Sequence, residues 1–161
     1  MELRGRFINE VKGIIDSSRE NAIRSVDQFR VRMYWELGKK IVEEEQNGKE
    51  RANYGTFLIR KLSEKLQAEN GKGYSIRQLE MFRIFYFTYP IAHAVRAQFT
   101  WTHYRLLLRV DNQQKREFYE SELIKSNWSS RQLERQINSQ LFERLLKSNS
   151  PEVILSLAKS E

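Results

Sequence analysis

The sequence predicts an all-α fold, a single compact domain of about seven or eight helices with helix-turn-helix-like elements. Glycine and proline are scarce, with 7 and 2 residues in 161, which is poor material for the many turns of an all-β fold. No segment alternates polar and apolar residues for long, whereas apolar residues recur at helical spacing along most of the chain. The length allows a sizeable core, and 40% hydrophobic and 12% aromatic residues indicate a folded chain.

The N-terminal part predicts a helical segment followed by one long helix. Leu3, Phe7 and Val11 repeat at helical spacing, and a longer periodic run extends from about residue 18 to residue 46, where Asn47-Gly48 is a good C-cap pair. This run carries apolar residues on two opposite sides, and a helix of that kind is sandwiched between partners. The partners are either helices of the same chain or a second chain, so a homodimer through the 19–46 helix is one of two open interpretations. One side carries Ile23, Val26, Phe29, Met33, Leu37 and Ile41, and the other carries Val31, Trp35 and Val42.

Capping signals predict the remaining helices. Serine followed three residues later by glutamine forms a capping box at Ser75 and again at Ser129. Ser150-Pro151 places proline at the first position of a last helix. The expected ranges are 54–69 after Asn53 as cap, 76–89 before Pro90, a short helix from Thr100 or Thr102 to Leu108, a helix from Asp111 or Asn112 to about Lys125, 130–147, and a helix from Pro151.

The two capping boxes belong to a repeated hexapeptide, S-x-R-Q-L-E, at residues 75–80 and 129–134. Each copy opens a helix after a shorter helix and a tight connection, which is the layout of a helix-turn-helix. Arginine and glutamine at such positions suit contacts with phosphates or base edges. The alternative is that each copy is only a helix cap followed by a core leucine.

Basic residues are distributed unevenly. Residues 1–53 hold eleven basic and ten acidic side chains, whereas residues 71–116 hold eight basic and two acidic ones, an excess of 8 − 2 = 6. Such a block predicts a polyanionic partner, most often nucleic acid. The alternative is a set of solvated arginines without a partner.

The candidate nucleic-acid-binding residues come from the first turns of the 76–89 and 130–147 helices and from the basic block. We expect the 76–89 helix to be buried along most of its length, and Arg131 and Arg135 to be the better-exposed pair. The aromatic residues of 99–108 could stack on bases beside arginine, or Trp101 and Tyr104 could be core anchors. The candidates are Lys72, Arg77, Gln78, Arg105, Arg109, Arg131, Gln132 and Arg135.

The sequence predicts a non-catalytic chain without metal or cofactor. Cysteine is absent, which excludes disulfides and thiolate metal sites. His93 and His103 have no carboxylate near them in sequence, so a free-standing enzyme would need a deep pocket that gathers one of them with distant carboxylates. No run of about 20 apolar residues and no signal peptide is seen, which predicts a cytoplasmic protein without membrane contact.

Several segments together resemble the N-terminal domain of the YhcG-like family of bacterial proteins, over residues 5 to 148. The resemblance implies a helix-turn-helix-type DNA-binding domain that precedes a PD-(D/E)xK nuclease-like domain, which would hold the active carboxylates and the metal. It places the helical domain at 1–149, and 150–161 as the start of a linker or terminal helix toward that absent C-terminal domain. The expected function is DNA binding and targeting, with a helical oligomerisation or protein-docking module as the alternative. The departures, threonines beside Trp101 and Phe142 in place of tyrosine, touch none of the candidate residues. The segments are Tyr34–Ile41, Tyr54-Gly55, Gly73–Ser75, Met81–Tyr86 with Pro90, Trp101–Leu107, Arg116–Tyr119 and Trp128–Ile137.

Overall fold

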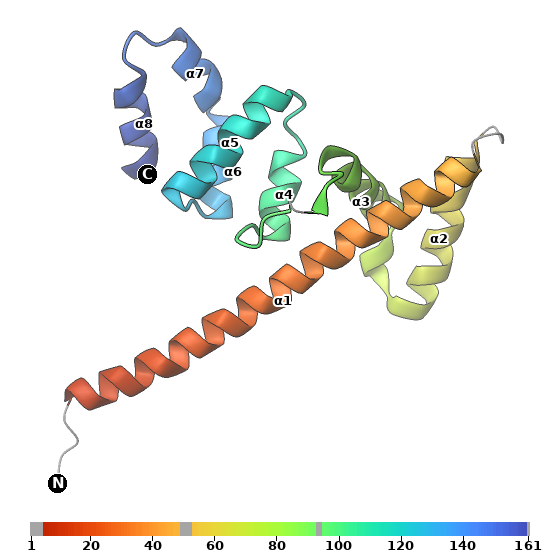
Figure 1. The fold of residues 1–161 in the computed structure, drawn as a ribbon, viewed down its shortest axis with the longest axis horizontal. Coiled ribbons are helices and arrows are strands. Elements are labelled where there is room, and N and C mark those ends of the chain that lie inside the picture. The colour runs from red at the N-terminus through yellow and green to blue at the C-terminus, as the bar shows by residue number, and fades with distance from the viewer. Residues whose placement is uncertain (1–4, 49–52, 93–94, 161) are drawn as a thin grey trace. The chain divides into compact units, whose positions relative to one another are not determined.

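A computed structural model describes residues 5–48, 53–92 and 95–160 and confirms the all-α fold class. These described residues contain eight α-helices and no strand (Figure 1). They divide into two compact units, residues 1–101 and 102–161. The helices are α1 Gly5–Asn47, α2 Tyr54–Asn70, α3 Ile76–Thr88, α4 Trp101–Leu107, α5 Gln113–Ser126, α6 Ser130–Asn138, α7 Leu141–Lys147 and α8 Pro151–Ser160, with a 3₁₀ turn, η1, at Lys72–Tyr74.

The first unit is built on the C-terminal half of α1. Figure 1 shows α2 and α3 packed along that half, while the N-terminal half of α1 extends beyond them. Val31, Trp35, Gly38 and Val42 lie on one face of α1 and are buried, because this face packs against α3. The predicted N-terminal segment and the long 19–46 helix form one continuous helix, although Leu3 lies outside the described residues.

Gly38 allows α1 and α3 to cross at close range. A Cβ atom built on Gly38 would lie 2.0 Å from the carbonyl oxygen of Phe82, so only glycine fits this crossing. Around it, the Tyr34 ring stacks on Phe82 at 4.2 Å between centroids. The Trp35 Nε1–H donates a hydrogen bond of 2.6 Å to the carbonyl oxygen of Tyr89.

The second unit packs α5, α6, α7 and α8 around a small apolar core. Leu107, Tyr119, Leu133 and Leu141 are fully buried within it. The Tyr119 hydroxyl donates to the carbonyl oxygen of Gln136 at 3.2 Å, which joins α5 to α6.

Two predicted details of the helix ends are wrong. Asn53 precedes α2, but it adopts a left-handed conformation (φ 64°) and its side chain makes no capping hydrogen bond. The predicted 130–147 helix is two helices, because the chain turns at Ser139 and Gln140. The Ser139 hydroxyl donates to the carbonyl oxygen of Gln136 at 3.3 Å, a local bond of the kind that competes with helix continuation.

Other helix ends are confirmed. Asn112 caps α5 by accepting a 2.9 Å hydrogen bond from the Lys115 N–H. The last helix begins at Pro151, as the preference of proline for the first helical position predicts. None of the helices, over the ranges described, is both long enough and apolar enough to cross a membrane.

Candidate nucleic-acid interface

The second unit contains the predicted sequence of a helix, a tight turn and a serine-capped helix. α5 ends at Ser126, the next residue Asn127 is left-handed (φ 48°), and α6 begins at Ser130. The Ser129 hydroxyl accepts from the Gln132 N–H at 3.3 Å, and the Gln132 side-chain oxygen accepts from the Ser129 N–H at 2.8 Å. This full capping box fixes the first turn of α6, where a recognition helix makes its contacts.

Arg131 and Arg135 lie on the outer face of α6. Leu133 and Gln136 point inward and are buried, while both arginines are exposed. Their spacing of four residues places the two guanidinium groups on one side of the helix, at a separation that can span neighbouring phosphates.

Arg105 and Arg109, near the end of α4, are exposed in the same unit. Arg109 Nη1 lies 3.8 Å from Glu134 Oε1 on α6, and both side chains are about half exposed. The structure therefore brings Arg109 next to α6, but part of its charge is neutralised there.

Lys72, Arg77 and Gln78 form a separate group in the first unit. Lys72 lies in η1, and Arg77 is exposed in the first turn of α3. The Ser75 hydroxyl accepts from the Gln78 N–H at 3.3 Å, so one half of the predicted capping box is present here.

The two glutamines differ in what they can offer a ligand. The Gln132 side-chain oxygen is used by the cap of α6, which leaves its amide NH₂ for other contacts. Gln78 is half-buried, and it is its backbone N–H, not its side chain, that takes part in the cap.

Much of the basic block is neutralised by carboxylates from outside it. Arg83 Nε lies 2.8 Å from Glu45 on α1, and Lys115 forms an ion pair with Glu143 on α7. This contact raises the pKa of Lys115 and lowers the pKa of Glu143, through a side-chain hydrogen bond first of all. Arg109 beside Glu134 is a further basic residue that faces an acidic partner distant in sequence. The local excess of charge therefore overstates the basic surface.

Sequence reasoning missed these three carboxylates. Glu45, Glu134 and Glu143 lie between 25 and 38 positions from their partners. Only Glu80, 3.5 Å from Arg83 and three residues before it, could be identified from helical spacing.

The aromatic residues of 99–108 are core anchors, as the second interpretation predicted. Tyr104 is fully buried, and the Trp101 ring lies 5.3 Å from Phe85 and 5.0 Å from Tyr34 between centroids. The expectation that α3 is buried beyond its first turn is wrong on one face, where Ile84 and Phe87 are exposed.

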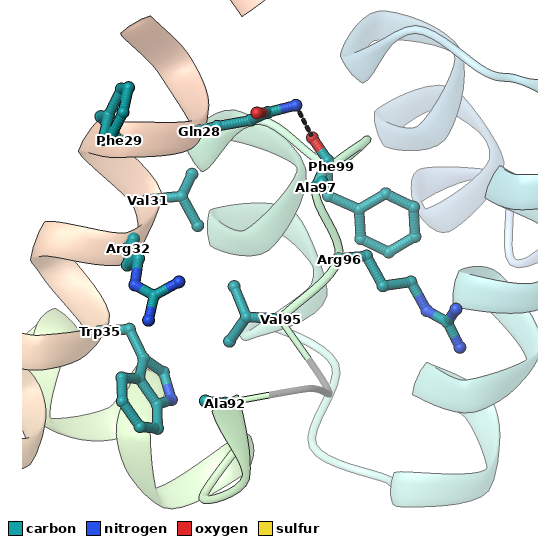
Figure 2. A pocket seen from close by; sticks show the side chains of 10 residues that line it. All are labelled: Gln28, Phe29, Val31, Arg32, Trp35, Ala92, Val95, Arg96, Ala97 and Phe99. Atoms are coloured by element: carbon teal, nitrogen blue, oxygen red, sulfur yellow. Dashed lines mark hydrogen bonds between the residues drawn. The ribbon is translucent and has the colours of Figure 1, made fainter. Parts of the chain in front are cut away.

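A cavity of about 230 Å³ lies in the first unit between α1 and residues 92–99. Figure 2 shows Val31 and Trp35 facing Val95 and Ala92 across it, with Gln28 donating to the carbonyl oxygen of Ala97 at 3.2 Å. Among the described residues, its lining includes Arg32 and Arg96 but no carboxylate and no histidine.

In the described part of the chain, the histidines do not form the catalytic pocket with distant carboxylates that a free-standing enzyme would need. His103 is buried in α4, and burial lowers its pKa. His93 lies outside the described residues. Among the residues the structure describes, no group of three His, Asp or Glu side chains could hold a metal ion. That the chain is non-catalytic stays a prediction.

Comparisons with known proteins connect the chain to one family. The family model described as the DUF1016 N-terminal domain matches residues 10–144. The chain is 34% identical, over 174 aligned residues, to a protein of Escherichia coli (strain K12) named "Putative nuclease YhcG". The match covers 88% of this chain and 46% of that relative, so the chain spans about half of the relative's length. No solved structure matches.

Proposed function

The chain belongs to the DUF1016 N-terminal domain family, and from this premise we propose that it binds DNA and targets a nuclease-like domain of a longer protein. Its own role in this proposal is non-catalytic. The carboxylates and metal that cut DNA would belong to a separate C-terminal domain, as the family resemblance implies, and the relative from Escherichia coli is named "Putative nuclease YhcG".

The observation that carries this proposal is the α5–α6 element. A full capping box fixes the first turn of α6, and Arg131 and Arg135 are exposed on the same helix. Guanidinium groups four residues apart on a fixed helix can bind successive phosphates, and the amide of Gln132 lies beside them for a base edge or a sugar. Arg105 and Arg109 add positive charge at the end of α4 in the same unit.

The group around η1 supplies a second contact in the proposal. Lys72 and Arg77 are exposed at the start of α3, where the backbone N–H groups of a helix N-terminus also favour an anion. Since this group lies in the first unit and α6 in the second, the contribution of Lys72 and Arg77 to DNA affinity is separate from that of Arg131 and Arg135.

Fluorescence anisotropy with a labelled DNA duplex tests the proposal. We expect binding that weakens steeply between about 50 and 200 mM salt, because each phosphate contact releases counterions. The variant Arg131→Glu/Arg135→Glu should lower the affinity at least tenfold and reduce the slope of log K against log salt by about 2.

A matched control separates a local contact from a change in net charge. Arg60→Glu/Lys65→Glu changes the charge by the same amount on exposed positions of α2, and it should leave most of the affinity intact. An equal loss in both double variants, or no binding of the unaltered chain at low salt, would contradict the proposal. Single-stranded DNA and duplex RNA as competitors identify the preferred nucleic acid.

A further inference from the structure

The N-terminal half of α1 carries a continuous apolar stripe that no helix of its own unit covers. Phe29 is 75% exposed, Val26 56% and Phe7 54%, values rarely seen together on one helix face. The stripe occupies the face of α1 opposite to Val31 and Val42, which pack against α3. Its exposed large side chains are Phe7, Ile8, Val11, Ile14, Ile15, Ile23, Val26, Phe29 and Met33.

The stripe follows a regular repeat of eleven residues. Ile15 and Val26 are spaced by eleven, as are Val11, Ala22 and Met33, and Phe7, Ser18 and Phe29. Leu37, eleven residues after Val26, already packs against the core of the first unit. Eleven residues make three turns at 3.67 residues per turn, so the stripe stays on one face of an almost straight helix. A repeat of this kind places layers at equal spacing along the helix, with smaller side chains at Ser18 and Ala22, and these layers match those of a second copy in register.

From these observations we propose that α1 pairs in parallel with α1 of a second copy of this chain. The area fits: nine large side chains that are each 36–75% exposed offer roughly the 800 Å² per partner that a stable interface buries. The first unit leaves the stripe open as far as Met33, because α3 packs on the opposite face of α1 and α2 packs near Leu37 and Ile41, beyond the stripe. This inference is independent of the proposed DNA binding.

The charges beside the stripe favour the parallel orientation. Lys12, Arg19 and Arg30 lie along one edge of it, and Ile14, Asn21 and Ser25 lie along the other. In an antiparallel pair like edges meet, so the basic edge would face the basic edge of the second copy, even with Asp27 3.4 Å from Arg30. In a parallel pair the basic edge meets the other edge, where Arg32 is paired with Glu36 at 3.3 Å.

Light scattering after size-exclusion chromatography tests the pairing on the whole chain. We expect a concentration-dependent mass of twice 19.3 kDa that persists at high salt, since apolar contacts hold the pair. Val26→Asp/Phe29→Asp should leave a monomer with unchanged helical circular dichroism. Phe57→Asp/Ile84→Asp, at exposed positions of α2 and α3, is the matched control and should still dimerise.

The absence of cysteine makes the orientation measurable by cross-linking. Val11→Cys and Met33→Cys should each form a disulfide with its own copy, because equivalent residues meet in a parallel pair. Glu20→Cys, on the opposite face, should not. A chain that stays monomeric at every concentration would overturn the proposal. Another part of the chain or a different protein would then cover the stripe. Cross-links that form only when the Val11→Cys and Met33→Cys variants are mixed would overturn the parallel arrangement.

Discussion

Replacing Gly38 by alanine should destabilise the first unit, even though alanine is the better helix former. The added Cβ would lie 2.0 Å from the carbonyl oxygen of Phe82 and 2.7 Å from its carbonyl carbon. Both are backbone atoms, so no side-chain rotation relieves the overlap. Since real Cβ contacts are essentially never below 3.0 Å, α1 and α3 must move apart by about 1 Å at this point.

The size of the effect follows from what that movement disturbs. The Trp35 hydrogen bond to Tyr89 and the stacking of Tyr34 on Phe82 both bridge the same crossing. Overpacking costs about 1–3 kcal/mol, and a weakened hydrogen bond adds about 1 kcal/mol. The better helix propensity of alanine offsets about 0.5–1 kcal/mol, so we expect a net loss of about 1–3 kcal/mol in the free energy of unfolding.

Gly13 provides the control, because it lies in the same helix with nothing within 4 Å of its added Cβ. Gly13→Ala should leave the stability unchanged or raise it. Thermal unfolding followed by circular dichroism and by the fluorescence of Trp35 and Trp101 measures both variants. A loss of 1 kcal/mol should lower Tm by roughly 4–8 °C for a unit of this size. Equal Tm values for the Gly38 and Gly13 variants would refute the close crossing of α1 and α3.

Two further predictions concern the second unit. Ser129→Ala removes the acceptor of the Gln132 N–H and should lower the free energy of unfolding by about 1 kcal/mol. Urea unfolding followed by Trp128 fluorescence measures this loss. Adding Gln132→Ala should lower the free energy of unfolding little further, because both residues serve one capping box. Additive losses in the double variant would contradict a shared box. Burial lowers the pKa of His103 below its ordinary 6.5, so the unfolded chain binds that proton more readily. The second unit should therefore lose stability as the pH falls below about 6.5, and His103→Gln should reduce this loss; an identical pH profile of the variant would contradict it.

The fold could be predicted largely because its signals are local. Ser129 and Gln132, Asn112, and Pro151 each mark a helix start through residues within one turn, and all three starts are confirmed. The break at Gln140 was missed because no glycine or proline marks it. Gln140 adopts a left-handed conformation (φ 54°) although it has a side chain, and Leu141 is fully buried immediately after the turn. Tertiary burial of that kind is not visible in a local pattern.

The candidate site was less predictable, because charge acts through space and not along the sequence. Arg131 and Arg135 could be placed on the outer face of a helix by their spacing from Leu133. That Arg83 and Lys115 face Glu45 and Glu143 depends on which helices pack together. The two apolar sides of α1 were visible in the sequence, but where the first unit buries them was decided by tertiary packing: Val31, Trp35 and Val42 are buried on one side, and Ile41 is buried at the end of the other.

The anchoring of α1 at one end also affects how its other half folds. Starting a helix is the unfavourable step, and each added residue then follows with little cost. The C-terminal half of α1 is held by tertiary packing, so it serves as the nucleus from which the exposed half grows. Any partner that binds the apolar stripe then meets a helix that is already formed. Association loses little conformational entropy as a result, and the strength of binding reflects the contacts of the stripe itself.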